Sequence, residues 1–253
     1  MQYPQISILC PTWNRNKWLP LIIHNIQNLD YDKKLLELVI LDDGNDKMFK
    51  NNDELKSFIK SVNIKVQYHY QTQRLKIGEK RNKLTKLAKY KICANLDTDD
   101  IFMPSWLKHS IDIMNSDKRC SLVGTKGMLF CYPDDHYDIT KIECGKKRMI
   151  HESGMLYTKK HHRMMGGFRK NSAGEGTSMI DYNENKCLCT EVKKVIVCIC
   201  HDENTITKDT FRDKSIGIAL TGELKTLIGS ILPNIKPYVK PKIYPTHNHF
   251  FNN

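Results

Sequence analysis

The sequence lacks several features that would assign it to a membrane or secretory class. No apolar run is long enough to span a bilayer, and the N-terminus enters strand-like sequence without the design of a signal peptide. There is no Asn-x-Ser/Thr glycosylation acceptor, and the nine cysteines, an odd number, show no disulfide framework. These absences predict a soluble, cytoplasmic protein with reduced thiols and no membrane span.

Signatures of nucleic-acid binding and of structural zinc are also missing. The formal net charge is +12, but the basic residues are dispersed and form neither an arginine-rich arm nor a zinc-finger spacing. The charge therefore indicates attraction to anionic ligands, and we expect no nucleic-acid partner. Two Cys-x-Cys pairs, at 187/189 and 198/200, are narrower than the usual zinc knuckle, so buried thiols are favoured over zinc.

With 253 residues the chain can form one sizeable core. We expect one domain over residues 1–210, made of two halves at 1–104 and 105–210. Residues 211–253 are then a C-terminal helix and a proline-rich arm. The helix, expected over Asp213 to Leu232, is amphipathic, and it either covers the core or pairs with a second copy in a homodimer.

The first half of the chain alternates strand and helix patterns. Gln5 to Cys10 is a β-type run, Trp18 to Asn28 an amphipathic helix, and Leu36 to Leu41 a second buried strand. Strand, helix and strand describe a βαβ unit, so an α/β fold with a mostly parallel sheet is expected. Such sheets place ligand-binding groups at the carboxyl ends of their strands. The turns after the strands are therefore candidates for a binding site.

An acidic segment, Asn95 to Pro104, follows a later apolar run. Asp97 and Asp99 are two residues apart, so in an extended segment their side chains point to the same side. With Asp100 they form three crowded carboxylates, whose mutual repulsion a hard dication such as Mg²⁺ or Mn²⁺ would offset. The competing interpretation is an acidic turn that caps the helix after Pro104.

Four polar motifs at these strand ends and helix starts follow one another along the chain. They are Pro11-Thr12-Trp13-Asn14-Arg15, Asp42-Asp43-Gly44, Gly78-Glu79-Lys80-Arg81-Asn82 and Leu96-Asp97-Thr98-Asp99-Asp100. Their order and spacing resemble the motif set of the family 2-type glycosyltransferases with the GT-A fold. The resemblance implies a Rossmann-like, mostly parallel twisted sheet flanked by helices, with a small mixed second sheet.

The resemblance also implies a nucleotide-sugar site, with residues 1–104 as the nucleotide-binding half of the domain and 105–210 as the acceptor half. In such a family the first turn holds the nucleotide, with Trp13 on or beside the base, Asp43 at the base edge and Arg81 at the base or phosphates. An aromatic residue and an acid at these positions fit uracil, so a UDP-sugar is the expected donor. The residues implied for this site are Pro11, Thr12, Trp13, Asn14, Arg15, Asp43, Gly78, Arg81, Asn82, Asp97 and Thr98.

A metal site follows from the same resemblance. Asp97 takes the ribose role and Asp99 the metal role, with Asp97 and Asp100 as further candidate ligands. A strand expected over Val192 to Cys200 delivers His201 in a His-x-x-Asn-Thr segment, where the family often places a metal or diphosphate contact. Imidazole is an acceptable ligand for Mn²⁺ and a less usual one for Mg²⁺, so Mn²⁺ is the expected ion, with Mg²⁺ as the alternative.

The general base is where the chain departs from the family pattern. After a Gly-Gly-Phe turn the family commonly has an acidic Gly-Glu-Asp motif, but this chain reads Gly174-Glu175-Gly176. Glu175 or Asp181 could deprotonate the acceptor, or no protein base is used, as in retaining transferases of this fold. Alternatively, Glu175 caps a helix expected over Ser178 to Asn185.

The expected function is metal-dependent transfer of a hexose from a UDP-sugar to a hydroxyl of a glycan or glycoprotein, collagen-like or structural proteins included. A dication and basic groups would stabilise the leaving diphosphate. His151 and Glu152 lie where an acceptor could pass. The rival activities are a sugar-phosphate nucleotidyltransferase, although Pro11 to Lys17 lacks the expected glycine-rich loop, and a degenerate nucleotide- or glycan-binding protein.

Overall fold

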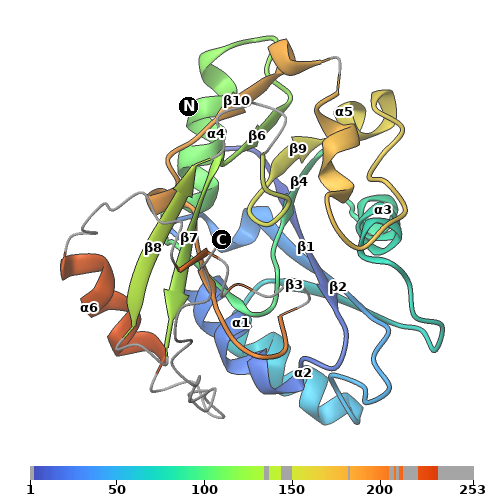
Figure 1. Ribbon diagram of the computed structural model, residues 1–253. Helices are drawn as coiled ribbons and strands as arrows, with labels where there is room; N and C mark the ends of the chain where they lie inside the picture. The colour runs from blue at the N-terminus through green and yellow to red at the C-terminus, as the bar shows by residue number, and fades with distance from the viewer. Residues whose placement is uncertain are drawn as a thin grey trace, which may run out of the picture.

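Two β-sheets and their flanking helices make up most of the computed structural model (Figure 1). The described residues are 3–133, 137–143, 150–181, 183–204, 208, 211–212 and 222–232. The predicted arm from Pro233 to Asn253 and the first part of the predicted C-terminal helix lie outside them.

The larger sheet has the strand order β10-β6-β9-β4-β1-β2-β3. Its strands are β1 (Ile6–Thr12), β2 (Leu36–Asp42), β3 (Lys65–Tyr70), β4 (Ile92–Asn95), β6 (Leu122–Gly124), β9 (Leu156–Thr158) and β10 (Cys187–Cys189). β1 to β4 are mutually parallel, whereas β9 runs antiparallel between β4 and β6. The mostly parallel sheet confirms the predicted α/β class.

Helices cover both faces of this sheet. They are α1 (Leu19–Gln27), α2 (Asn52–Val62), α3 (Ile77–Leu87), α4 (Trp106–Ser116) and α5 (Lys159–Met164). Every residue of β1 is buried, and its side chains alternate between two cores. Ile8 packs in the core that contains α1, α2 and α4, whereas Leu9 packs with Leu84 of α3 on the other face. Burial on both faces explains why these strands read as continuous apolar runs.

A smaller sheet packs beside the first, with the order β5-β11-β7-β8. Its strands are β5 (Asp100–Phe102), β7 (Gly127–Tyr132), β8 (Asp138–Glu143) and β11 (Ile196–Ile199). β11 is antiparallel to β5 and parallel to β7, which confirms the predicted small mixed sheet. Residues 96–99 connect β4 of the larger sheet to β5 of the smaller one, so the acidic segment lies at the junction of the two sheets.

Two predicted elements are wrong in their extent. The described residues of Ser178 to Asn185 do not form the expected helix, and the short 3₁₀ turns η4 (Glu175–Met179) and η5 (Glu184–Lys186) overlap the two ends of this stretch. Gly176, Thr177, Ser178 and Asn183 are weak helix formers, and Met179 is fully buried, so tertiary packing rather than helix propensity sets the local structure. The strand expected over Val192 to Cys200 begins with a 3₁₀ turn, η6 (Val192–Lys194), and is extended only over β11.

The C-terminal helix α6 (Gly222–Ile231) is described over the second part of its predicted range. Ile228, Ile231 and Leu232 are buried in the same core as α1 and β7, while Leu227 is 39% exposed. The helix therefore covers the core, one of the two roles expected for it. Pairing with a second copy stays a prediction, as does the division of the domain after Pro104.

Across the described ranges, no helix combines the length and the apolar character that a bilayer crossing requires. The cytoplasmic location stays a prediction.

Candidate active site

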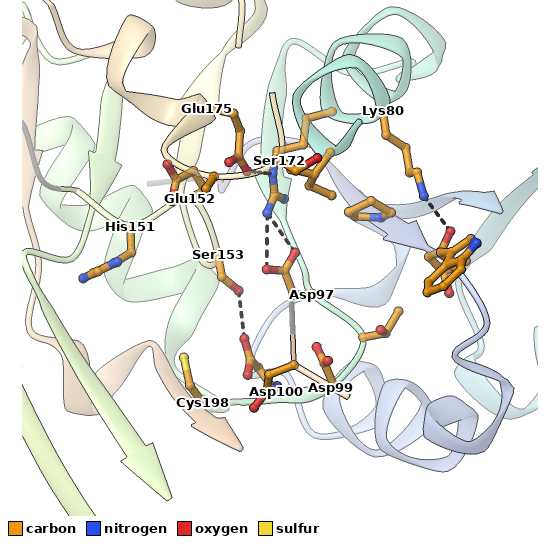
Figure 2. A pocket seen from close by; sticks show the side chains of 18 of the residues that line it. Lys80, Asp97, Asp99, Asp100, His151, Glu152, Ser153, Ser172, Glu175 and Cys198 are labelled. Carbon is orange, nitrogen blue, oxygen red and sulfur yellow. Dashed lines mark hydrogen bonds and ion pairs between the residues drawn. The ribbon is translucent and has the colours of Figure 1, made fainter. Parts of the chain in front are cut away.

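A cavity of about 620 Å³ opens at the carboxyl ends of β1 and β4, between the two sheets (Figure 2). Its lining comes from the turn after β1, the segment leading into α3, the acidic segment, the loop before β9 and the loop before η4. Residues of β7 and β11 line it from the smaller sheet. Segments distant in the sequence therefore meet in one place, as expected for the carboxyl edge of a parallel sheet.

Most of the residues expected to form a site line this cavity. They are Pro11, Thr12, Trp13, Arg15, Arg81, Asp97, Thr98, Asp99, Asp100 and Glu175. The other predicted residues lie outside the lining, although the structure describes all of them: Asn14, Asp43, Gly78, Asn82, Asp181 and His201.

Arg81 of α3 links two carboxylates of the cavity. Its Nη2 lies 3.0 Å from Asp97 Oδ1 and 3.2 Å from Oδ2, and its Nε donates to Glu175 Oε1 at 3.0 Å. Burial of the guanidinium works against its charge, but Asp97 and Glu175 hold the pKa of Arg81 above its usual value. The charges of the three side chains thus partly offset one another inside the protein.

Asp99 faces an arginine and a histidine. Its Oδ2 is 3.4 Å from Arg15 Nη2 and 3.1 Å from His201 Nε2. Burial raises the pKa of Asp99, but the hydrogen bond from His201 and the charge of Arg15 outweigh it and lower the pKa below its usual value. The His201 ring packs against Trp18, with the ring centroids 4.8 Å apart, and its Nδ1 accepts the Glu203 backbone N–H at 3.2 Å. The imidazole is therefore held with Nε2 toward Asp99.

Asp100 is oriented differently from its two acidic neighbours. It begins β5, its Oδ2 accepts from Ser153 Oγ at 3.2 Å and its Oδ1 accepts from the Ile199 N–H at 3.3 Å. Burial, followed by the charges of Asp99 and Asp97, raises the pKa of Asp100 well above its usual value. The two carboxylate oxygens of Asp100 thus connect the loop before β9 to the smaller sheet by hydrogen bonds.

Asp43 and Lys80 form a buried ion pair under the cavity. The Asp43 side chain is fully inaccessible and also accepts the Leu75 N–H at 2.8 Å, while Lys80 donates to Thr12 O at 2.8 Å. Burial lowers the pKa of Lys80. Lys80 thus fastens the carboxyl ends of both β1 and β2 to α3. Lys80 itself lines the cavity. The sequence analysis gave it no role, although it lies within the motif Gly78-Glu79-Lys80-Arg81-Asn82.

Three predicted site residues have contacts that shape the backbone around the cavity. Asn14 has a φ of 52° and its Oδ1 accepts the Asn45 N–H at 2.8 Å. A Cβ on Gly78 would lie 1.7 Å from Arg169 O, so glycine permits close packing there. Asn82 exchanges two hydrogen bonds of 2.8 Å with the backbone of Phe168, which fastens the Gly-Gly-Phe turn to α3.

The two candidate bases differ in position. Glu175 lines the cavity beside Arg81, whereas Asp181 lies outside it in an ion pair of 3.0 Å with Arg169. Several lining residues were given no binding or catalytic role from the sequence: Arg74, Lys76, Lys80, Ser153, Ser172, Lys208 and Phe211. Arg74 could have been found only through its tertiary contact, with its Cζ 3.7 Å from the centre of the Trp13 ring.

For metal binding the structure offers a pair of ligands rather than a cage. Within the described residues no group of three or more His, Cys, Asp and Glu side chains could hold an ion. The carboxylate of Asp99 and the imidazole of His201 nevertheless fit a dication that takes its other ligands from a bound diphosphate and water. In the structure a hydrogen bond of 3.1 Å joins His201 Nε2 to Asp99 Oδ2, and a dication held by these two groups would take the place of its proton. Cys187 and Cys189 lie in β10 of the larger sheet, whereas Cys198 lies in β11 of the smaller sheet. The two Cys-x-Cys pairs therefore belong to different sheets.

A mostly parallel sheet, a smaller mixed sheet and an acidic connection between them at the cavity define the GT-A class of fold. Residues 7–170, more than half of the chain, match the family described as Glycosyl transferase family 2. The chain belongs to this family, which confirms the resemblance inferred from its motifs. Glu175 and His201 lie beyond the matched residues.

Solved structures with the same fold include TarS of S. aureus and the mannosyltransferase PcManGT of Pyrobaculum calidifontis. TarS 1-349 in complex with UDP has a TM-score of 0.61 and 14% identity, covering 78% of this chain and 61% of that chain. PcManGT in complex with GDP-Man and Mn²⁺ has a TM-score of 0.62 and 14% identity, covering 85% and 60%. The chain thus spans about 60% of the length of these structures. None of the curated proteins compared with the chain matches it.

Proposed function

We propose that the chain transfers a sugar from a UDP-sugar to a hydroxyl group of a glycan or glycoprotein, and that Mn²⁺ supports the reaction. The observation that carries the proposal is the acidic segment after β4, where Asp97 pairs with Arg81 and Asp99 lies between Arg15 and His201 at the cavity. Carboxylates for a ribose and a metal, together with basic groups for a diphosphate, are the set that a nucleotide-sugar requires.

Donor binding is assigned to the side of the cavity formed by the larger sheet. Trp13 offers an aromatic face to the base, and Arg74 packs against its ring and holds it in place. Asp97, oriented by Arg81, offers carboxylate oxygens to the ribose hydroxyls. The UDP complex of TarS supports a uridine nucleotide, whereas GDP-Man in PcManGT is the reason to test other bases.

Asp99 and His201 are the proposed metal ligands. The ion would supply Lewis-acid stabilisation of the charge that develops on the departing diphosphate. Arg15, 3.4 Å from Asp99, adds positive charge at the same place and is itself held by Glu203 through an ion pair of 3.1 Å. Arg15 would therefore place positive charge beside the leaving diphosphate, next to the carboxylate of Asp99.

The acceptor is assigned to the side of the cavity formed by the smaller sheet and the loop before β9. Phe130 and Phe211 stack there with ring centroids 5.0 Å apart, and His151 and Lys208 lie in the same wall. Aromatic and polar side chains of this kind suit a sugar ring with its hydroxyls. Of the two bases considered from the sequence, Glu175 lines the cavity and Asp181 does not.

A panel of nucleotide-sugars, each assayed for release of free nucleoside diphosphate with Mn²⁺ and with EDTA, tests the proposal. We expect one UDP-sugar to be turned over in a Mn²⁺-dependent manner, and Asp99→Ala to reduce that turnover at least about 100-fold. Asp53→Ala, which removes a carboxylate that is 92% exposed, is the matched control and should leave turnover unchanged. Turnover that resists both EDTA and Asp99→Ala would refute the metal assignment.

Gly176, at the position where the resemblance leads us to expect an acid, favours one second candidate, a degenerate transferase that only binds a nucleotide. Calorimetric titration with UDP and Mn²⁺ separates the two. A protein that binds UDP but releases it from no donor is a binder, and the transfer proposal is then wrong.

A further inference from the structure

Glu152 occupies the space that a side chain at position 176 would fill. A Cβ built on Gly176 would lie 2.6 Å from Glu152 Cγ, 2.9 Å from its Oε1 and 3.1 Å from its Cδ. The Gly176 N–H donates to Glu152 Oε1 at 2.9 Å. The glycine thus makes room for a carboxylate that arrives from another part of the chain.

The loop that carries Glu152 is fixed to the acidic segment. Asn95, the last residue of β4, donates through Nδ2 to Glu152 O at 2.9 Å, and Ser153 Oγ donates to Asp100 Oδ2 at 3.2 Å. Glu152, His151 and Ser153 all line the cavity, and Figure 2 shows Glu152 and Glu175 in the same part of its wall. Glu152 is therefore held at a defined position relative to Asp97.

Glu175 is less available to an acceptor than Glu152. It is 4% exposed, and its Oε1 already accepts a hydrogen bond from Arg81 Nε at 3.0 Å. Glu152 is partly exposed, and no cation forms an ion pair with it among the residues that the structure describes. Its Oε1 is bound by the Gly176 N–H, while its Oε2 has no hydrogen-bond partner in the described chain.

From this geometry we propose that Glu152 is the general base that deprotonates the acceptor, in place of the acid missing at position 176. The inference rests on the proposed transfer from a UDP-sugar and names a catalytic residue for it. Because the base is a protein carboxylate acting on the acceptor, the reaction inverts the configuration at the anomeric carbon.

The electrostatics of the loop agree with this role. Burial, followed by the charge of Glu175, raises the pKa of Glu152, while the Gly176 N–H and Arg81 work in the opposite direction. A carboxylate with a raised pKa accepts a proton more readily than an ordinary one.

The proposed step balances as a single displacement. The acceptor oxygen bonds to the anomeric carbon as its proton passes to Glu152 Oε2. The bond between that carbon and the diphosphate oxygen breaks, and its electron pair leaves with UDP. The proton on Glu152 returns to solvent once UDP and the product have dissociated.

The first test compares Glu152→Gln with the wild type, using the UDP-sugar selected by the panel and water as the acceptor. We expect kcat for UDP release to fall about 100- to 10,000-fold, with UDP and Mn²⁺ binding unchanged by calorimetry. Glu191→Gln changes an exposed glutamate outside the cavity and should leave both unaltered. A Glu152→Gln protein that keeps the wild-type kcat would overturn this inference alone. A wild type that releases UDP from no donor would instead overturn the proposed function, and the inference with it.

Azide separates a base from a merely structural residue. The azide anion attacks without losing a proton, so it should raise turnover of Glu152→Ala at least about tenfold and yield the glycosyl azide of inverted configuration. The wild type should gain no such increase. Absence of rescue in a Glu152→Ala protein that still binds UDP would contradict the base role.

Moving the carboxylate provides a second variant. Glu152→Gly removes both the acid and the obstruction, and Gly176→Asp in the same chain then returns a carboxylate to the vacated space. The double variant should turn over the donor at least about tenfold faster than Glu152→Gly alone. Equal turnover of the double and single variants would contradict the proposal that a carboxylate at position 176 can replace Glu152.

Discussion

The two sides of the cavity are built differently. On the donor side, β1 and β2 pair over seven residues each, in a core with helices on both faces. On the proposed acceptor side, β5 and β11 of the smaller sheet span three and four residues, and the loop before β9 also lines the cavity. The proposed donor side is therefore held by longer paired strands, with helices on both faces, than the β5 and β11 pair of the proposed acceptor side.

Arg81 is the side chain that joins the two sides, so removing it should have the largest effect. Arg81→Met leaves Asp97 and the buried Glu175 without their cation, and we expect the free energy of unfolding to fall by about 3 kcal/mol or more. Urea unfolding measures this loss, and UDP affinity should fall with it. Arg119→Met breaks an exposed pair with Asp117 and should change stability by less than about 1 kcal/mol. Similar losses in both variants would contradict the special position of Arg81.

Gly78 tests how closely the start of α3 must approach the loop before η4. Its Cβ would meet the backbone carbonyl of Arg169 at 1.7 Å, and a carbonyl cannot move aside as a flexible side chain can. Gly78→Ala should therefore lower the free energy of unfolding by about 2 to 3 kcal/mol and displace the loop that carries Glu175. Thermal unfolding and UDP release measure the two effects. Gly229→Ala in α6, whose Cβ would meet nothing closer than 3.9 Å, should leave both intact.

Much of the donor side could be predicted from the sequence because its signals are local. The runs of β1 and β2 and the turns that follow them are contiguous in the chain, and their order carried the family resemblance. His201, the expected metal partner of Asp99, is 102 residues away from it and was reachable only through that resemblance. Its role as a ligand stays a prediction.

Tertiary contacts explain what the sequence could not reveal. Asp43 was expected at a base edge, but the partner that buries it, Lys80, is 37 residues away and has no local signature. The approach of Glu152 to Gly176 likewise joins a loop and a 3₁₀ turn that are separate in the chain. The missing acid was visible in the sequence, and Glu152 was expected near the acceptor, but its approach to Gly176 could be found only in the structure.

Helix α5, outside the cavity lining, contains a buried histidine, His162, that should make the stability of the protein sensitive to acid. Burial, followed by the charges of His161, Lys86 and Lys159, lowers the pKa of His162 from 6.5 to about 4. Its Nε2 lies 2.7 Å from Asn82 Oδ1, where the neutral ring can donate. Between pH 6.5 and 4 the unfolded chain binds the proton and the folded chain does not, so stability falls as pH falls.

We expect this histidine to remove about 2 kcal/mol of stability between pH 7 and pH 5, measured by urea unfolding at both values. His162→Asn removes the titrating group, and its stability should therefore change less over the same interval than that of the wild type. Identical pH dependence in the two proteins would show that His162 does not titrate as proposed.

The smallest expected effect belongs to the donor side, at Trp13. Trp13 lines the cavity, and Arg74 packs against one face of its ring. The proposal assigns the other face of the ring to the nucleotide base. Trp13→Leu should weaken UDP binding about tenfold, because stacking of a base on an aromatic ring contributes about 1 to 3 kcal/mol. Trp13→Phe keeps a ring and should lose less. Calorimetry with UDP and Mn²⁺ measures both affinities. Unchanged affinity in Trp13→Leu would show that the base binds elsewhere in the cavity.

Neither variant touches the loop of Glu152. Azide rescue of Glu152→Ala should therefore persist when this change is combined with Trp13→Phe, which would separate donor binding from the acceptor step.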